Sequence, residues 1–160
     1  MVRWLRAAAL GALMVTAQGC GGTPERDAGK TVQALLAATA SGDAKAFEEA
    51  IDRPALRADL RQQMIGVARA NGLDVGGPSD FALDRMIGPQ AIKLSPPGAP
   101  SLAQLTPVLK STGKDRVCLH DLTPQQACLL TFAHEPGGWR LVSMPAGDVV
   151  VAIPPAPVKK

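Results

Sequence analysis

Aromatic side chains are the scarcest class in this sequence: they form 3% of its 160 residues, and tyrosine is absent altogether. Bases and sugars are usually bound by stacking on exposed aromatic rings, so this composition argues against a stacking platform. The core must instead be built from aliphatic residues, and a hydrophobic fraction of 46% is sufficient for one. The length corresponds to one ordinary domain with an additional end segment.

An excess of charge of one sign is also missing. The chain has 17 basic and 14 acidic side chains. Two of the basic ones, Arg3 and Arg6, lie in an N-terminal segment that we expect to be removed, which leaves 15 basic and 14 acidic side chains. A nucleic-acid binder needs a concentrated positive field, so we expect no nucleic-acid partner.

Long apolar runs are missing as well. The apolar run near the N-terminus, Ala7 to Ala17, has 11 residues, whereas a membrane-spanning helix needs about 20. It follows a short basic start, Met1 to Arg6, and precedes small residues near position 20. This order of parts is typical of a secretory signal peptide.

The residues Thr16-Ala17-Gln18-Gly19 stand directly before the first cysteine, Cys20. This stretch resembles the lipobox of bacterial lipoproteins, in which a small residue precedes an obligatory cysteine. The resemblance implies cleavage between Gly19 and Cys20, with residues 1–19 as the signal peptide and a lipid anchor on Cys20. The sequence departs from the usual pattern at Ala17, where most lipoproteins have leucine. The alternative is an ordinary signal peptide, which would leave a secreted protein with a free cysteine.

A lipid on Cys20 would hold the protein at a bacterial cell envelope, facing the periplasm, with residues 20–22 as a short tether. One acyl chain alone binds a bilayer only marginally, because each buried methylene contributes about 0.8 kcal/mol. The diacylglycerol and N-acyl groups implied by the resemblance would anchor the chain firmly. Gly21, rather than aspartate, follows the cysteine, which by enteric sorting rules favours the outer over the inner membrane. We expect the membrane as one partner and an unidentified protein or small molecule as another.

The segment after the tether carries the start and stop signals of four helices. Thr23, Asp43 and Asp52 stand where helix caps are preferred, and apolar residues recur at helical spacing after each of them. The stop signals are Ser41-Gly42, Asn71-Gly72 and Gly88-Pro89. Beyond the last of these, Ile92 and Leu94 extend the helical pattern.

After a proline-rich loop at 95–100, the apolar pattern becomes that of strands. Short runs rich in valine, leucine, cysteine and phenylalanine are separated by turn signals. We expect strands at 116–122, 127–134 and 139–144, with 149–153 as a candidate fourth. Pro136 and Gly137 suit the second and third positions of a type II turn.

Helices followed by a strand meander predict a single α+β domain over residues 23–153. We expect the N-terminal helices to pack on one face of a C-terminal three- to four-stranded antiparallel sheet. Residues 154–160 (PPAPVKK) form a proline-rich tail with two lysines.

The stretch from Ser41 to Met64 combines three features: Gly42-Asp43, then Ile51-Asp52-x-Pro54-x-Leu56-Arg57, then a Leu/Gln-rich helix. It resembles the opening of an uncharacterised bacterial envelope family, domain of unknown function 2939 (DUF2939). The Gly88-Pro89 turn and a late Trp139-Arg140-Leu141 strand extend the likeness over residues 31–144. No activity is established for that family, so the resemblance implies a shared fold and no reaction.

The other two cysteines, Cys118 and Cys128, flank the turn around Thr123. In a hairpin centred there they would face each other across the strands, and disulfides persist in exported proteins. We therefore predict a Cys118–Cys128 disulfide, with two buried free thiols as the alternative. A metal site is a third interpretation, because Cys118 and His120 alternate onto one strand face and Cys128 could join them as a soft ligand. The disulfide and the metal site exclude each other.

Histidine suits acid–base catalysis near neutral pH, and the chain has two, His120 and His134. Neither belongs to a serine elbow, an H-E-x-x-H motif or a paired-carboxylate motif. Asp121 follows His120, but neighbours on a strand point to opposite faces and do not form a simple dyad. We expect surface histidines and predict no catalytic residue, no resident metal and no cofactor.

Arg53, Arg57 and Arg61 fall on one stripe of the third expected helix. They could touch anionic lipid headgroups, but we interpret them as a solvated face that nearby acids balance. These acids are Glu48, Glu49, Asp52 and Asp59. Trp139 opens a strand after a tight turn, and we interpret it as a core anchor rather than a ligand platform.

An anchor without catalytic motifs favours a non-catalytic binding or envelope-support module of unknown molecular function. One alternative is a small enzyme that uses His120 or His134 in a pocket between helices and sheet. Another is a metal-handling protein with a site at Cys118, His120 and Cys128. A deep pocket lined by a histidine and a carboxylate would favour the enzyme, and a filled core would favour the binding module.

Overall fold

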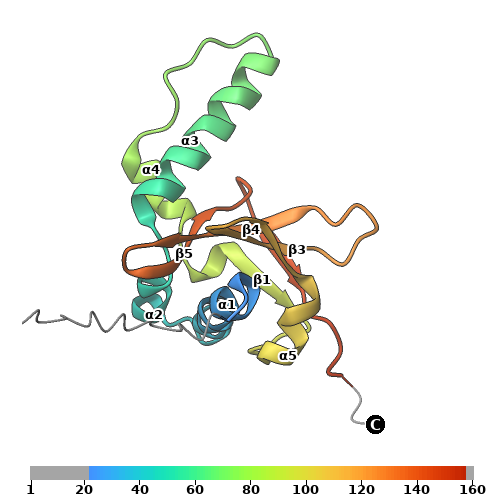
Figure 1. The fold of residues 1–160 in the computed structure, drawn as a ribbon. Helices are drawn as coiled ribbons and strands as arrows, with labels where there is room; N and C mark the ends of the chain where they lie inside the picture. Colours follow the sequence, from blue (N-terminus) through green and yellow to red (C-terminus); the bar gives the residue numbers. More distant parts are fainter. Residues whose placement is uncertain (1–21, 158–160) are drawn as a thin grey trace, which may run out of the picture.

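The computed structural model describes residues 22–157 of the chain (Figure 1). The expected signal peptide and the expected lipidation at Cys20 therefore lie outside the described residues. Within residues 22–157, no helix is both long enough and apolar enough to cross a bilayer.

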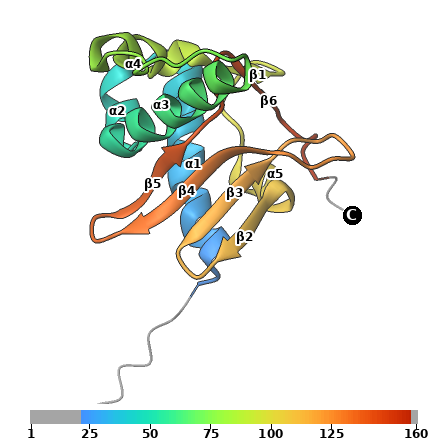
Figure 2. The ribbon, with the colours of Figure 1, turned by 90° about the horizontal axis from the view of Figure 1, so that it is seen from above.

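Four antiparallel strands form the main sheet, in the order β2-β3-β4-β5. Their bounds are β2 Leu109–Gly113, β3 Arg116–His120, β4 Cys128–Glu135 and β5 Gly138–Ser143. The longer helices precede this sheet in the chain, and the long helix α1 (Pro24–Ser41) lies across one of its faces (Figure 2). The predicted α+β class, with N-terminal helices on one face of a C-terminal antiparallel sheet, is confirmed.

Two of the three predicted caps, Asp43 and Asp52, form capping hydrogen bonds, whereas the side chain of Thr23 forms none although α1 starts directly after it. The Asp43 carboxylate accepts the backbone N–H of Ala46 at 3.0 Å, and the Asp52 carboxylate accepts that of Ala55 at 2.9 Å. Each satisfies a donor that the first turn of a helix leaves without a partner. The remaining helices are α2 Ala44–Glu49, α3 Arg53–Ala70, α4 Asp80–Met86 and α5 Leu102–Leu105, with 3-10 turns η1 Pro89–Ala91 and η2 Thr106–Val108.

The prediction that Ile92 and Leu94 continue a helix is wrong. They belong to strand β1 (Ile92–Ser95), which pairs in parallel with β6 (Val149–Ala152) in a separate two-stranded sheet. The partner strand lies more than fifty residues further along the chain, so no local pattern reveals the pairing.

The predicted segment 149–153 is a strand, β6, but it lies outside the main sheet, whose fourth strand is β2. Leu109 is the only buried residue of β2, and the four that follow are exposed. The strand therefore lacks the alternation of apolar and polar residues by which strands are recognised in a sequence.

The β4–β5 turn also differs from the prediction. A type II turn requires a positive φ at its third residue, Gly137, whereas the positive φ of 108° falls on Gly138. Gly138 already pairs with Glu135 in the ladder. The unusual backbone conformation is thus taken up by the first residue of β5, and the type II prediction is wrong.

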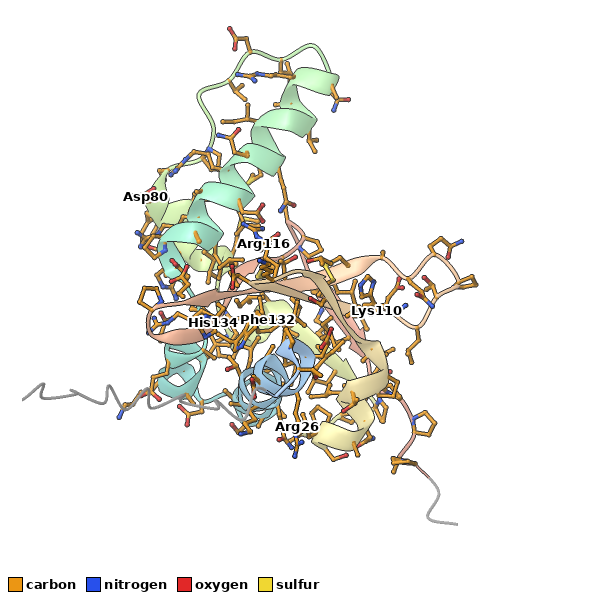
Figure 3. All side chains as sticks on the ribbon, in the orientation of Figure 1. Arg26, Asp80, Lys110, Arg116, Phe132 and His134 are labelled. Carbon is orange, nitrogen blue, oxygen red and sulfur yellow. A yellow bond between two sulfur atoms is a disulfide. The ribbon has the colours of Figure 1, made fainter. Side chains whose placement is uncertain are left out.

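The hydrophobic core lies between α1 and the sheet. Val32, Leu35 and Leu36 of α1 are fully buried, as are their core neighbours Leu119, Phe132 and Leu141 of the sheet. Phe132 points to the α1 side of the sheet and Arg116 to the opposite side (Figure 3). Among residues 22–157, no polar or charged side chain is buried, so the core is filled with apolar groups alone.

Backbone pairing at the edge of the sheet determines where α3 begins. The N–H of Asp52 donates to the carbonyl oxygen of Leu141 at 2.9 Å, and the N–H of Leu141 donates to that of Ala50 at 3.0 Å. The α2–α3 link therefore continues the sheet beside β5, and α3 starts from this edge.

Beyond its first two turns, α3 leaves the body of the protein (Figure 1). Leu56 and Leu60 are fully buried, but no later residue of α3 is. We call residues 61–82 the arm: they comprise the distal part of α3, the loop that returns from it, and the start of α4.

Candidate functional site

The disulfide between Cys118 and Cys128 is present, with their Cα atoms 5.7 Å apart. The two cysteines are not directly opposite each other as expected. Cys118 pairs with Thr131 and Cys128 with His120, because the register shifts between Leu119 and His120. The bridge is therefore confirmed, but it runs diagonally across the two strands.

This bridge removes two of the three ligands that the metal-site alternative requires. Both sulfurs are bonded to each other, and a disulfide sulfur is a poor metal ligand. Within the part of the chain that the structure describes, no three histidine, cysteine, aspartate or glutamate side chains gather in a way that could hold an ion. Nothing in the geometry supports a metal-handling role at His120.

His120 and Asp121 line one small pocket of about 220 Å³ beside the disulfide-linked hairpin. β3 ends at His120, so strand alternation does not extend to Asp121. No hydrogen bond joins these two side chains in the described part of the chain, and Oδ1 of Asp121 is buried without a hydrogen-bond partner. Nδ1 of His120 contacts the Gln126 carbonyl oxygen, and the Asp121 carboxylate accepts the Thr123 hydroxyl at 2.7 Å. The ring and the carboxylate do not form a catalytic pair.

His134 lies at the end of β4, on the same side of the sheet as Phe132 (Figure 3). Its ring meets the indole of Trp139 edge-on, with the ring centres 5.3 Å apart and the planes inclined by 68°. His134 is exposed, and its ring forms no hydrogen bond or ion pair with a carboxylate of residues 22–157. Within the described part of the chain, His134 therefore lacks the neighbouring carboxylate and the deep pocket that the enzyme alternative requires.

Trp139 packs against the core and also lines a groove at the surface. Its indole is half-buried and packs against the core, as interpreted from the sequence. It also lines a groove of about 370 Å³ between α1, α2 and the β4–β5 turn. Small residues form much of this groove, including Ala34, Ala46 and Gly137, while Lys30 and Glu49 are its charged members. The sequence indicated the tryptophan but not the hollow beside it.

The three arginines of the α3 stripe, Arg53, Arg57 and Arg61, form ion pairs with aspartates of α4. Arg57 donates to both carboxylate oxygens of Asp84, at 2.7 and 2.6 Å, and Arg53 donates to the same group at 2.9 Å. Arg53 also pairs with Glu48, and Arg61 pairs with Asp80. The stripe is a set of ion pairs that ties α4 to α3, and it is not a free surface for lipid headgroups.

Hydrogen bonds from Arg57, and secondarily from Arg53, hold the pKa of Asp84 below its ordinary value of 3.8. The acids predicted to balance the stripe are mostly different ones. Asp52 caps α3 and Asp59 accepts a hydrogen bond from Gln63. Asp80 and Asp84 were missed, although their spacing of four residues matches that of the arginines and could have indicated the pairing.

The arm exposes large apolar side chains. Val67 is 65% exposed and Phe81 is 72% exposed, and Leu73 and Val75 are exposed as well. Leu56, Leu60 and Val67 recur at helical spacing, which predicts that they share one core-facing stripe of α3. That interpretation is correct for the first half of α3 and wrong for the second, because the body of the protein ends before the helix does.

An apolar hollow of about 420 Å³ lies where α3 passes the β5–β6 loop, lined by Met64, Val67, Pro145 and Ala146. Gln63 holds the loop against the helix. Its side-chain amide donates to the Met144 carbonyl oxygen at 2.9 Å and accepts the Ala146 N–H at 3.0 Å. The hollow is therefore a built feature at the base of the arm.

Comparison with known proteins identifies no relative: no family model, no curated protein and no solved structure matches this chain. The resemblances to the lipobox and to DUF2939 therefore stay predictions.

Proposed function

We propose that this chain is a lipid-anchored protein of the bacterial cell envelope whose domain is a non-catalytic binding module, and that the arm is the surface that contacts a partner protein. The observation that carries the proposal is the exposed apolar surface of the arm, above all Phe81 and Val67. Four of the six large apolar side chains that are exposed among residues 22–157 belong to this one segment, and a concentration of exposed apolar surface marks an interaction site.

The base of the arm is fixed, which suits a surface that must be presented to a partner. Leu56 and Leu60 are buried at its root. Asp84 forms ion pairs with two arginines of α3, and Arg61 forms one with Asp80 at the start of α4. The arm therefore keeps its direction although none of its side chains is completely buried. A preorganised surface loses less conformational entropy on binding.

The charge of the arm favours a protein over a lipid surface as its target. Residues 61–82 carry two arginines, Arg61 and Arg69, and two aspartates, Asp74 and Asp80. Segments that insert into membrane interfaces combine an apolar face with an excess of lysine and arginine. The balanced charge of the arm is more typical of a protein interface.

The anchor rests on the leader sequence. A basic start, a short apolar run and small residues before Cys20 support export and lipidation. Helix α1 begins at Pro24, only four residues after Cys20, so a lipid there would keep the domain close to the bilayer. A protein confined in this way meets membrane and envelope proteins far more often than a freely diffusing one.

Site-specific photo-crosslinking in the native membrane tests the arm. A photoreactive phenylalanine derivative replaces Phe81, 72% exposed, in one version of the chain and Val150 of β6, 56% exposed, in a control version. We expect a discrete protein adduct from position 81 that Val67→Ser abolishes, and none from position 150. Equal adducts at both positions would refute a dedicated arm surface, and adducts to lipid alone would refute a protein partner.

Fractionation tests the anchor independently. We expect the wild-type chain to partition with membranes and into detergent, and the Cys20→Ser chain to appear in the soluble fraction. If the variant fractionated with membranes as before, the lipid anchor would be excluded, while the crosslinking result at position 81 would still stand.

A further inference from the structure

We propose that the groove beside Trp139 binds the proline-rich tail, residues 154–160, of a second copy of this chain. The inference involves neither the arm nor the lipid anchor, so it can fail without affecting the proposed function.

The groove is lined by one aromatic side chain, Trp139, and largely by small residues. The Trp139 indole is steadied by the edge-on ring of His134, 5.3 Å away between ring centres. Opposite and around it stand Ala34 of α1, Ala46 of α2 and Gly137 of the β4–β5 turn, which leave about 370 Å³ of space. Proline-rich segments dock on aromatic-lined grooves of this kind because their backbone is already ordered before binding.

The tail has the composition of such a ligand. Proline fixes φ near −65° and removes a backbone donor, so PPAPVKK favours the extended polyproline II helix. That helix has three residues per turn, which places Pro154 and Pro157 on the same edge. Pro155, Ala156 and Pro157 are exposed. The tail leaves the body at Pro154, whose carbonyl oxygen accepts the Gln104 side-chain amide at 2.8 Å.

The charges of the groove complement those of the tail when the tail is bound in one of its two possible orientations. Lys159 and Lys160 follow the prolines. Glu49 lines the groove on the α2 side and forms no salt bridge within residues 22–157. Lys30 stands on the α1 side. A bound tail would thus direct its lysines toward Glu49 and away from Lys30, with its prolines on the indole.

The occupant comes from another copy because residues 154–157, where the tail begins, and the groove lie on opposite sides of the body. In Figure 1 the chain leaves at the lower right, whereas α2 and the β4–β5 turn are at the left, with α1 between them. A groove on one side and its ligand on the other form a head-to-tail interface, in which each copy can bind the next.

Tryptophan emission gives a direct readout. The chain has two tryptophans, Trp4 and Trp139, so a full-length chain with Trp4→Phe reports on the groove alone. We expect the synthetic peptide PPAPVKK to shift the Trp139 emission in a saturable way. A peptide with alanine at the three proline positions should leave it unchanged. Glu49→Lys should weaken binding by about threefold or more, since reversing an exposed charge pair changes affinity modestly, whereas Asp74→Lys on the arm should not.

Sedimentation then tests the second copy. We expect the full chain to associate with rising concentration, and a chain that ends at Ile153 to remain monomeric. The proposal is overturned if the peptide leaves Trp139 emission unchanged, or if the alanine peptide acts equally. It is also overturned if the intact and shortened chains sediment alike at every concentration, because the groove would then not take the tail of another copy.

Discussion

Asp84 is the residue on which the base of the arm depends. One carboxylate accepts hydrogen bonds from Arg57 through both oxygens and from Arg53 through one. A two-pronged arginine–carboxylate pair is geometrically specific as well as favourable. The shared anion therefore fixes the orientation of α4 against α3, while the buried Leu83 and the partly buried Met86 pack α4 against the core.

The docking of α4 should depend on pH. Because the arginines lower the pKa of Asp84 in the folded protein below its ordinary value of 3.8, its contribution to stability is complete well above that value. This contribution is lost as the pH falls through 3.8 to the lower folded pKa. A carbon-13 titration of the Asp84 carboxyl should give a midpoint below 3.8, and Arg57→Gln should raise it. A midpoint at or above 3.8 in the wild-type chain would contradict the ion pairs.

The disulfide should stabilise the hairpin that carries His120. Closing a loop of this length removes conformational entropy from the unfolded chain, worth about 2–3 kcal/mol. We expect the double variant Cys118→Ala, Cys128→Ala to lose about that much free energy of unfolding, measured by urea denaturation under non-reducing conditions. Reduced wild-type protein is the control and should behave like the double variant. An unchanged midpoint would show that the bridge does not constrain the unfolded state.

At the scale of elements, Gly42 and Gly66 allow the effect of backbone conformation on stability to be measured without a change in packing. A Cβ atom at Gly66 in α3 or at Gly42 after α1 would meet no atom within 4 Å. They differ in φ: Gly42 has a φ of 70°, whereas Gly66 is an ordinary helical residue.

Alanine substitutions at these two positions should therefore have opposite effects. Gly66→Ala should raise the free energy of unfolding by about 0.5–1 kcal/mol, because glycine is the poorer helix former. Gly42→Ala should lower it by about 1 kcal/mol, because alanine is strained at positive φ. Thermal and urea unfolding of both variants provide the measurement, and effects of the same sign would refute this account of the α1 terminus.

Elements were predictable from the sequence where their signals are local. Asp43 and Asp52 act as helix caps, and the strands β3 to β5 lie within a few residues of the expected ranges. The edge strand β2 was not predictable, because four of its five residues are exposed. The sequence predicts a helical extension at Ile92 and Leu94 because their spacing also fits a helix. They form a strand because β6, which is distant in the chain, pairs with them.

At the scale of the whole molecule, stability is distributed unevenly. Leu35 of α1 and Phe132 of β4 lie in a fully buried core, whereas the arm beyond Leu60 buries no side chain completely. Helical hydrogen bonds without tertiary packing open locally and at low cost. The body and the arm should therefore respond differently to the same conditions.

Hydrogen exchange should show this difference. We expect amides of residues 65–78 to exchange much faster than those around Leu35 and Phe132 at neutral pH. If the arm were protected as strongly as the core, it would have to be packed against something, in this chain or in another copy. Comparing dilute with concentrated protein distinguishes these two cases.

The sequence by itself determined the boundaries of α1 to α3, the positions of the four strands β3 to β6 and the partners in the disulfide, because caps, turns and a short hairpin act over a few residues. Only the tertiary structure decided which half of the α3 apolar stripe is buried. It also decided that Asp80 and Asp84 meet the arginines, and that β1 finds β6. The reason is physical: burial, ion pairing and parallel strand pairing depend on segments that are distant in the chain, and only the folded body brings them together.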